Sequence, residues 1–310
     1  MRDNGPINVL HGTARAVEHT PRSPRGTDVP PDAKLLYLDL LKKCLTRSLW
    51  EETLRPYEIP PWGGALKRRL KKIALDRLRA LQIEPFERVP FDHYTRELGR
   101  DWPLDADTMI GLRRLDNIQE CVTTVIRDDI PGDLVETGVW RGGASIFMRA
   151  VLAAYGDTTR RVWCADSFQG LPTPNVIDYP ADKIAQWHKR QELVVSLDTV
   201  KKNFARYGML DDQVMFLKGW FKDTLPKAPI EKCAVIRLDG DMYESTMDAL
   251  NCLYDKLSPG GFLIIDDYGI PEDTCRRAIH DFRDAHGIRE PIVDIDGWGA
   301  YWRRPLNADA

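Results

Sequence analysis

Two apolar stretches of the sequence each end in a pair of acidic residues. The stretch CAVIRLDGD ends in Asp239 and Asp241, and the stretch GFLIIDD ends in Asp266 and Asp267. If these stretches are neighbouring parallel strands, their carboxyl ends lie at one edge of a sheet, where open α/β sheets bind ligands. Carboxylates packed together repel one another unless a cation lies between them. Oxygen ligands suit Mg²⁺, so the pattern predicts a magnesium site formed by Asp239, Asp266 and Asp267.

Asp241 has a different predicted role. It lies two residues after Asp239, and in an extended chain the two side chains point to the same side. A free carboxylate beside the metal is well placed to act as a general base on a metal-bound hydroxyl. The alternative is that the acids pair with Arg or Lys, or cap the helices that follow them. The sequence has no histidine pair at metal-ligand spacing, which argues against zinc.

Two earlier strand ends predict a site for a nucleoside. Glu136 precedes the glycine-rich turn TGVWRGGAS, in which Gly138 and the later glycines allow the backbone to approach a ligand closely. This turn is not the G-x-G-x-x-G dinucleotide fingerprint. Asp166 ends the next strand, where an acid typically binds ribose hydroxyls. The alternatives are a tight turn without a ligand, and an Asp that caps its own loop.

The elements that would position these residues alternate between strand and helix. The prediction places strands at 133–137, 161–166, 214–219, 233–239 and 261–267, helices at 143–155, 196–208, 245–257 and 272–286, and two final strands around a turn at Asp296 and Gly297. Short apolar strands that alternate with helices are typical of a parallel sheet covered on both faces. The long insertion at 170–195 interrupts the alternation, and insertions of this length are often lids.

The N-terminal part has a different composition. Residues 1–33 are rich in Pro, Arg, Thr and Gly without periodicity, which predicts a disordered tail. Apolar residues at helical spacing predict helices at 34–55, at 66–81 and from about residue 104, the last with Asp107 as its N-cap. The helix at 66–81 is strongly basic. We interpret it as a solvated surface helix, and the alternative is contact with a membrane surface or an anionic partner.

Composition narrows the class of protein. The chain has 310 residues and a formal net charge of -3, which gives no electrostatic case for nucleic-acid binding. Its six cysteines form no C-x-x-C pair. Four of them lie inside apolar runs, which predicts buried free thiols in a reducing compartment: Cys121, Cys164, Cys233 and Cys252. The sequence shows no apolar run of membrane-spanning length and no signal-peptide pattern at its start. We therefore expect a cytoplasmic protein.

Several long segments resemble one known family. They are LVETGVWRGGAS, ADSFQGLP, NFARYGMLDDQVMFLKGWFKDTLP, VIRLDGDMY, LSPGGFLIIDDYGIP and GAYWRR. Together they are similar to the macrocin O-methyltransferases, the Mg²⁺-dependent sugar O-methyltransferases of antibiotic biosynthesis that use S-adenosylmethionine. Within that family the noviose 4-O-methyltransferases of aminocoumarin pathways are the most similar in these segments. The likeness extends from about Leu35 to Arg304, and the basic helix at 66–81 is a departure from it.

The resemblance implies an α/β fold with the seven-stranded, mostly parallel, Rossmann-like sheet of class I methyltransferases and an N-terminal helical extension. The implied division is a tail at 1–33, a helical or lid region at 34–130 and a catalytic domain at 131–305. The implied S-adenosylmethionine contacts are Met109, Glu136, Thr137, Gly138, Ser145, Asp166, Ser167, Lys218, Gly219, Trp220 and Asp239. Asp239, Asp266 and Asp267 would bind Mg²⁺, and Asp241 would be the base, with Asp239 beside it in catalysis. The expected substrate is a glycosylated natural product, and the expected assembly is a homodimer or a higher homo-oligomer.

Three other functions are alternatives to this one. A haloacid-dehalogenase-type phosphotransferase also uses an apolar strand that ends in D-x-D, but it leaves Glu136 and Asp166 without a role. A methyltransferase-like scaffold that binds cofactor and a partner would have no use for Asp241. A nicotinamide dehydrogenase is weakened by the missing G-x-G-x-x-G.

Overall fold

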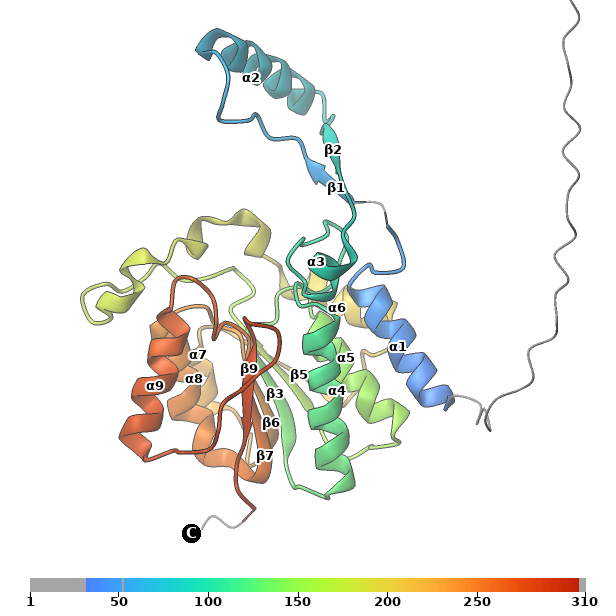
Figure 1. Cartoon of the computed structure of the whole chain (residues 1–310). Helices are drawn as coiled ribbons and strands as arrows, with labels where there is room; N and C mark the ends of the chain where they lie inside the picture. Colours follow the sequence, from blue (N-terminus) through green and yellow to red (C-terminus); the bar gives the residue numbers. More distant parts are fainter. Residues whose placement is uncertain (1–31, 52, 307–310) are drawn as a thin grey trace, which may run out of the picture. The chain divides into compact units, whose positions relative to one another are not determined.

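The fold is built on a seven-stranded sheet in the order β5-β4-β3-β6-β7-β9-β8 (Figure 1). The computed structural model describes residues 32–51 and 53–306, so the predicted tail lies almost wholly outside the described residues. The strands of the sheet are β3 (Asp133–Thr137), β4 (Val162–Asp166), β5 (Val214–Lys218), β6 (Cys233–Leu238), β7 (Leu257–Ile265), β8 (Val293–Asp294) and β9 (Ala300–Arg303). Strands β3 to β7 pair in parallel, and β9 is antiparallel to both β7 and β8. The predicted α/β class and mostly parallel sheet are confirmed.

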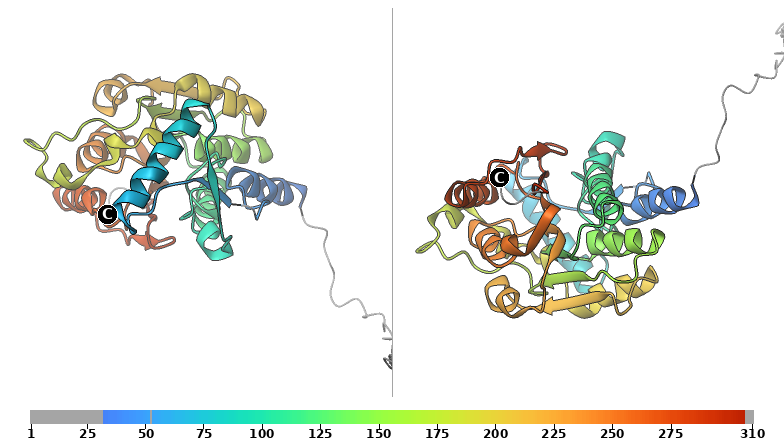
Figure 2. Two further views of the ribbon diagram at one scale, coloured as in Figure 1. Left: turned by 90° about the horizontal axis from the view of Figure 1, so that it is seen from above. Right: turned by 90° about the horizontal axis from the view of Figure 1, so that it is seen from below.

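Helices cover both faces of this sheet, as Figure 2 shows from two sides. The main ones are α4 (Leu112–Arg127), α5 (Gly143–Ala154), α6 (Leu197–Arg206), α8 (Tyr243–Leu253) and α9 (Thr274–His286). Successive side chains of a strand point to opposite faces, so Leu134 packs with α4 and α5 while Val135 packs with α8 and α9. All six residues of β6 are buried, as expected for a parallel strand covered on both faces.

The order of the strands reverses beside β3, whose two neighbours are β4 and β6. Ligands of such sheets bind at this point, outside the carboxyl ends of the strands. Gly138 directly follows β3 with a φ of 89°, and a Cβ atom there would lie 1.6 Å from the carbonyl oxygen of Asp239. Glycine is therefore required where the ends of β3 and β6 meet.

The N-terminal part differs from the prediction at the end of its first helix and in a small sheet. Helix α1 (Ala33–Leu45) ends ten residues earlier than predicted, because the chain turns at Arg47, whose φ is 61°. A two-stranded antiparallel sheet of β1 (Thr53–Pro56) and β2 (Phe86–Val89) was missed, since such short strands carry no clear alternation. Between them α2 (Ala65–Ala80) confirms the basic helix.

The predicted N-cap at Asp107 is wrong. Helix α4 starts at Leu112, with Gly111 as its N-cap, and α3 (His93–Glu97) precedes it. The carboxylate of Asp107 instead accepts hydrogen bonds from Arg206 and from the hydroxyl of Tyr207.

The insertion at residues 170–195, which we call the lid segment, contains three short 3-10 helices. These are η1 (Pro180–Ile184), η2 (Trp187–Lys189) and η3 (Gln191–Leu193). The remaining short elements are α7 (Phe221–Thr224), η4 (Leu225–Lys227) and η5 (Tyr254–Lys256). Among the described helices, none is long and apolar enough to cross a bilayer.

The prediction of buried cysteines needs one correction. All six cysteines are free, and Cys121, Cys164 and Cys233 are buried as expected. Cys252, however, is only half-buried, although it packs against the core, whereas Cys275 in α9 is buried.

Candidate active site

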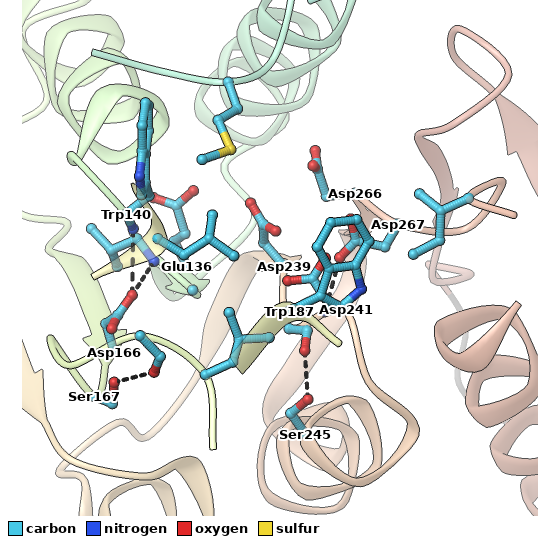
Figure 3. A pocket seen from close by; sticks show the side chains of 18 of the residues that line it. Glu136, Trp140, Asp166, Ser167, Trp187, Asp239, Asp241, Ser245, Asp266 and Asp267 are labelled. Atoms are coloured by element: carbon cyan, nitrogen blue, oxygen red, sulfur yellow. Dashed lines mark hydrogen bonds between the residues drawn. The ribbon is translucent and has the colours of Figure 1, made fainter. Parts of the chain in front are cut away.

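A cavity of about 640 Å³ lies at the carboxyl ends of the strands. Of the residues predicted from the sequence, it is lined by Met109, Glu136, Gly138, Asp166, Ser167, Trp220, Asp239, Asp241, Asp266 and Asp267. Four predicted cofactor contacts do not line it: Thr137, Ser145, Lys218 and Gly219. Thr137 and Ser145 are buried behind the wall, and the Lys218 side chain is exposed. Acids from four strand ends thus meet in one cavity (Figure 3).

Glu136 lies on the inner wall of the cavity and is nearly inaccessible to solvent. Its Oε1 accepts a hydrogen bond of 2.5 Å from Arg237, and its Oε2 accepts one from the hydroxyl of Ser145. Burial raises the pKa of Glu136 to about 7, although the charge of Arg237 opposes the rise. Ser145 therefore acts on the cavity through Glu136 in this structure.

Arg237 is the central cation of the site, and the sequence reasoning missed it. Its side chain is 2% exposed and pairs with acids at the ends of three neighbouring strands. One nitrogen, Nη1, lies 2.5 Å from Glu136 and 2.8 Å from Asp239, and Nη2 pairs with Asp266. These carboxylates outweigh the cost of burial and raise the pKa of Arg237. A charged residue inside the apolar strand CAVIRL was the signal that could have revealed it.

Asp266 pairs with two arginines and Asp239 with one, so both acids realise the arginine-pairing alternative that the sequence left open. One oxygen lies 2.6 Å from Nη1 of Arg114 in α4, and the other pairs with Arg237. Burial opposes ionisation of Asp266, but the two guanidinium groups prevail and lower its pKa. Arg114 also lies 3.0 Å from Asp296, so it connects the end of β7 to the turn between β8 and β9.

Asp239, Asp241 and Asp267 converge. One carboxylate oxygen from each lies within 4.8 Å of the others, the one group in the described part of the chain with the spacing of metal ligands. Burial and the charge of Asp266 raise the pKa of Asp239 to about 6. Burial and the neighbouring carboxylates also raise the pKa values of Asp241 and Asp267 well above their usual range. A divalent cation would relieve this repulsion, so the donor set fits Mg²⁺.

The chain at Asp241 is not extended, and that part of the prediction is wrong. Asp241 has a φ of 58°, in the left-handed region that non-glycine residues rarely adopt. Its N–H donates to Oδ2 of Asp267 at 3.0 Å, and its carbonyl accepts from the hydroxyl of Thr274 at 2.6 Å. The turn, rather than an extended strand, brings Asp241 beside Asp239.

Asp166 caps the loops around it. Its Oδ2 accepts from the backbone N–H of Val139 at 2.7 Å and of Trp140 at 3.4 Å, and its Oδ1 accepts from Phe168 at 2.6 Å. Burial raises its pKa in spite of these bonds. The capping alternative is therefore realised, and it leaves Asp166 on the cavity wall, where the ribose contact was predicted.

Aromatic residues form the outer wall, which the sequence reasoning did not identify. Trp102, Trp187 and Trp298 line the cavity from three separate segments. The guanidinium of Arg190 lies 5.5 Å from the ring centre of Trp102 and 5.0 Å from that of Trp187. Figure 3 labels Trp187, which belongs to the lid segment, and Asp241 among the residues that line the cavity. Such a wall offers apolar faces to an acceptor next to the acidic cluster.

The sequence profile described as macrocin O-methyltransferase (TylF) matches residues 34–304. The chain belongs to this family. It is 54% identical over 273 residues, 88% of this chain and 94% of the relative, to the 8-demethyl-8-(2,3-dimethoxy-alpha-L-rhamnosyl)-tetracenomycin-C 4'-O-methyltransferase of Streptomyces olivaceus. It is 49% identical over 229 residues, 71% of this chain and 87% of the relative, to the demethyldecarbamoylnovobiocin O-methyltransferase of Streptomyces niveus.

The fold of this chain is similar to that of the O-methyltransferase NovP, whose structure has been solved. The two share a TM-score of 0.73 and 43% identity, and the match covers 88% of this chain and 99% of that one. The predicted family and the class I methyltransferase fold are confirmed, and the chain is an O-methyltransferase that uses S-adenosylmethionine. Family and fold both disfavour the phosphotransferase and dehydrogenase alternatives.

Proposed function

We propose that the enzyme transfers the methyl group of S-adenosylmethionine to a sugar hydroxyl of a glycosylated natural product, in a reaction that depends on Mg²⁺. The names of the relatives support the acceptor class, because one acts on a rhamnosyl-tetracenomycin and another on a novobiocin precursor. The convergence of Asp239, Asp241 and Asp267 at the cavity carries the metal part of the proposal. S-adenosylmethionine supplies an electrophilic methyl group on a sulfonium centre.

The cofactor would occupy the side of the cavity formed by the ends of β3 and β4. Glu136 lies there with its charge partly balanced by Arg237, and it can accept hydrogen bonds from the ammonium group of the methionine portion. Asp166 lies at the end of the next strand, and its oxygens retain lone pairs for the ribose hydroxyls. The absence of a side chain at Gly138 leaves room for the ligand between them.

The charges of the site favour a bound cation. Two guanidinium groups, Arg114 and Arg237, face the five carboxylates of Glu136, Asp239, Asp241, Asp266 and Asp267. We propose that Asp239 and Asp267 hold Mg²⁺ together with Asp266, whose oxygens keep free lone pairs beside the two arginines. When bound, Mg²⁺ lowers the pKa of a nearby hydroxyl.

Asp241 would receive the proton of the acceptor hydroxyl. Burial and like charges raise its pKa from that of an ordinary carboxylate, which moves its basicity toward that of a useful general base. The left-handed turn holds its carboxylate next to those of Asp239 and Asp267. Alignment of the acceptor oxygen, the methyl carbon and the sulfur is the main contribution expected of the surrounding walls.

Incubation with S-adenosylmethionine, Mg²⁺ and a panel of glycosylated natural products tests this function. We expect an acceptor that gains one methyl group, and a chelator should stop its formation. Binding of S-adenosylmethionine without turnover on any glycoside would support the scaffold alternative instead.

We further propose a homodimer or higher homo-oligomer in the cytoplasm that acts on a small glycoside and not on nucleic acid. Six free cysteines suit a reducing compartment, and the net charge of -3 does not favour a polyanion. Sedimentation at several protein concentrations tests the assembly.

A further inference from the structure

The lid segment carries one carboxylate that is wholly buried. Asp182, in η1, is 0% exposed. Its Oδ1 accepts a hydrogen bond of 2.7 Å from the backbone N–H of Tyr243, and its Oδ2 accepts one of 3.0 Å from that of Glu244. These two residues begin α8, so both oxygens of a lid residue are bonded to the start of a helix of the sheet domain.

Helix α8 depends on this carboxylate for its cap. The first N–H groups of a helix have no partner within the helix, and a nearby negative charge is favourable there. The N-cap residue of α8 is Met242, whose side chain makes no capping hydrogen bond. Asp182, in the lid segment, therefore supplies the capping carboxylate that Met242 cannot provide.

The start of α8 directly follows the turn that carries Asp241. Two hydrogen bonds hold Asp241 in its left-handed conformation. Its N–H donates to Asp267, and its carbonyl accepts from the hydroxyl of Thr274. Two residues later the bond from Tyr243 to Asp182 fixes the exit of the turn. The turn is therefore held by the bend after β7, by α9 and by the lid segment together.

The same lid segment also covers the cavity. Trp187 and Arg190 belong to its second half and line the cavity. Farther along, the carbonyl of Glu192 accepts a hydrogen bond of 2.8 Å from the indole nitrogen of Trp140. Hydrogen bonds thus attach the lid segment through Asp182 to α8 and through Glu192 to the loop after β3.

We propose that Asp182 is a positioning residue that couples the lid segment to Asp241. With the lid shut, Asp182 caps α8 and fixes the turn; with the lid open, the cap is lost and the turn is released. Asp241 is then in place for catalysis only when the lid segment covers the cavity. The catalytic part of this inference rests on the proposed role of Asp241, whereas the attachment of the lid does not.

Trypsin cleavage of the native full-length protein at Lys183 and Lys189, followed by mass spectrometry, measures how often the lid opens. Both side chains are exposed. In Asp182→Asn, one oxygen becomes an NH₂ group and the charge is lost, so we expect cleavage at these sites to be about tenfold faster or more. The matched control is Asp178→Asn, because Asp178 is an exposed lid residue bonded to Asn175; its cleavage rate should stay within about twofold of wild type.

A second pair of variants tests the same hydrogen bond through its donor, the backbone N–H of Tyr243. Tyr243→Pro lacks the N–H that Asp182 accepts, and proline is tolerated at the first position of a helix. The preceding Met242 is extended, with φ −100° and ψ 162°, which a following proline requires. Tyr243→Ala loses the same side chain but keeps the N–H. We expect faster cleavage in Tyr243→Pro than in Tyr243→Ala. Asp182→Asn should add less in the Tyr243→Pro background than in the wild type, because only the bond from Glu244 is left to lose.

Kinetics on the methyl acceptor separate positioning from mere attachment. We expect Asp182→Asn and Tyr243→Pro to lower kcat about tenfold or more while the Kd of S-adenosylhomocysteine stays within twofold. Faster cleavage with an unchanged kcat overturns the coupling to Asp241, and wild-type cleavage in both variants overturns the attachment. If Asp182→Asn does not fold, as judged by its melting curve, the Tyr243 pair decides. Failure of the proposed function appears separately, as no turnover by the wild-type enzyme, and leaves the cleavage result standing.

Discussion

Replacing Arg237 by methionine removes the cation that joins three strand ends. Its guanidinium bonds to Glu136 at 2.5 Å and to Asp239 at 2.8 Å, and it also pairs with Asp266. Methionine fills much of the same volume with a flexible apolar chain, so the main effect is the loss of charge and hydrogen bonds.

The expected loss of unfolding free energy depends on which ion-pair partners each acid keeps in the variant. Removal of one partner of a buried ion pair typically costs about 3–5 kcal/mol, because the other charge stays buried. Asp266 keeps Arg114 at 2.6 Å, and the side chain of Asp239 is 30% exposed, so both retain some compensation. Glu136 is 2% exposed and loses its ion pair. We expect the lower end of the range, about 3 kcal/mol of unfolding free energy at pH 8.

The loss of unfolding free energy in Arg237→Met, which we call the deficit, depends on pH through the titration of Glu136. The pKa of Glu136 is raised to about 7 by burial, above its value in the unfolded chain, so the native state binds the proton more tightly. Stability contributed by this proton is present at low pH and falls as the pH rises toward 7. Without Arg237 the pKa of Glu136 rises further. The deficit of the variant is therefore largest at pH 8 and shrinks by pH 5.5, where Glu136 is protonated in both proteins.

Urea unfolding followed by circular dichroism at pH 5.5 and pH 8 measures both effects, provided that the slopes of the transitions agree. The matched control is Arg149→Met, since Arg149 pairs with Asp211, a carboxylate that is 41% exposed. We expect the control to lose about 1 kcal/mol or less. A deficit for Arg237→Met below about 1 kcal/mol at pH 8, or one that grows as the pH falls, would refute the assigned charge network.

Three further predictions concern the site. Gly138→Ala should lower the melting temperature far more than Gly156→Ala, because both glycines have positive φ but only the first has backbone within 4 Å of the added Cβ. Asp241→Asn should lower kcat about 10²–10⁴-fold and leave the calorimetric Kd of S-adenosylhomocysteine unchanged, and a rate within about twofold of wild type would exclude a base at this position. Addition of MgCl₂ should raise the melting temperature of the wild type more at pH 8 than at pH 5.5, because ionised carboxylates bind the metal, and the Asp239→Asn and Asp267→Asn variants should lose this shift. An equal shift in these variants would place the metal elsewhere.

Much of the sheet could be predicted because each strand is encoded locally. The β6 strand is an unbroken apolar run apart from Arg237, and the helices that follow the strands have regular apolar spacing. The β1 and β2 pair could not be found in this way. Each strand has four residues, and 29 residues separate Pro56 from Phe86. Their pairing is a non-local contact, and neither segment has a sequence pattern that predicts it. The early end of α1 could not be predicted either, because Arg47 adopts a left-handed conformation that arginine rarely adopts.

The acids of the site were found from the sequence, but their individual partners were not. Asp266 and Asp267 are adjacent and look equivalent, yet neighbouring side chains of an extended chain point in opposite directions. One of them meets Arg114, which lies more than 150 residues earlier in the sequence, and the other meets the N–H of Asp241. Pairing with arginine and convergence around a cation were weighed as alternatives for the whole set. The structure realises the first for Asp266 and, through Arg237, also for Asp239, and it has the geometry of the second at Asp239, Asp241 and Asp267.

The turn at Asp241 explains how these two arrangements coexist. An extended chain would have carried Asp241 away from Asp267, and the hydrogen bond between them would not form. The left-handed conformation costs roughly 1–2 kcal/mol for a residue other than glycine. Hydrogen bonds at its N–H and carbonyl offset this cost, and they come from the bend after β7 and from α9, segments that the chain reaches only after the turn. The position of the proposed general base is therefore a property of the assembled fold, and Thr274→Val should loosen the turn at Asp241 without altering any acid of the site.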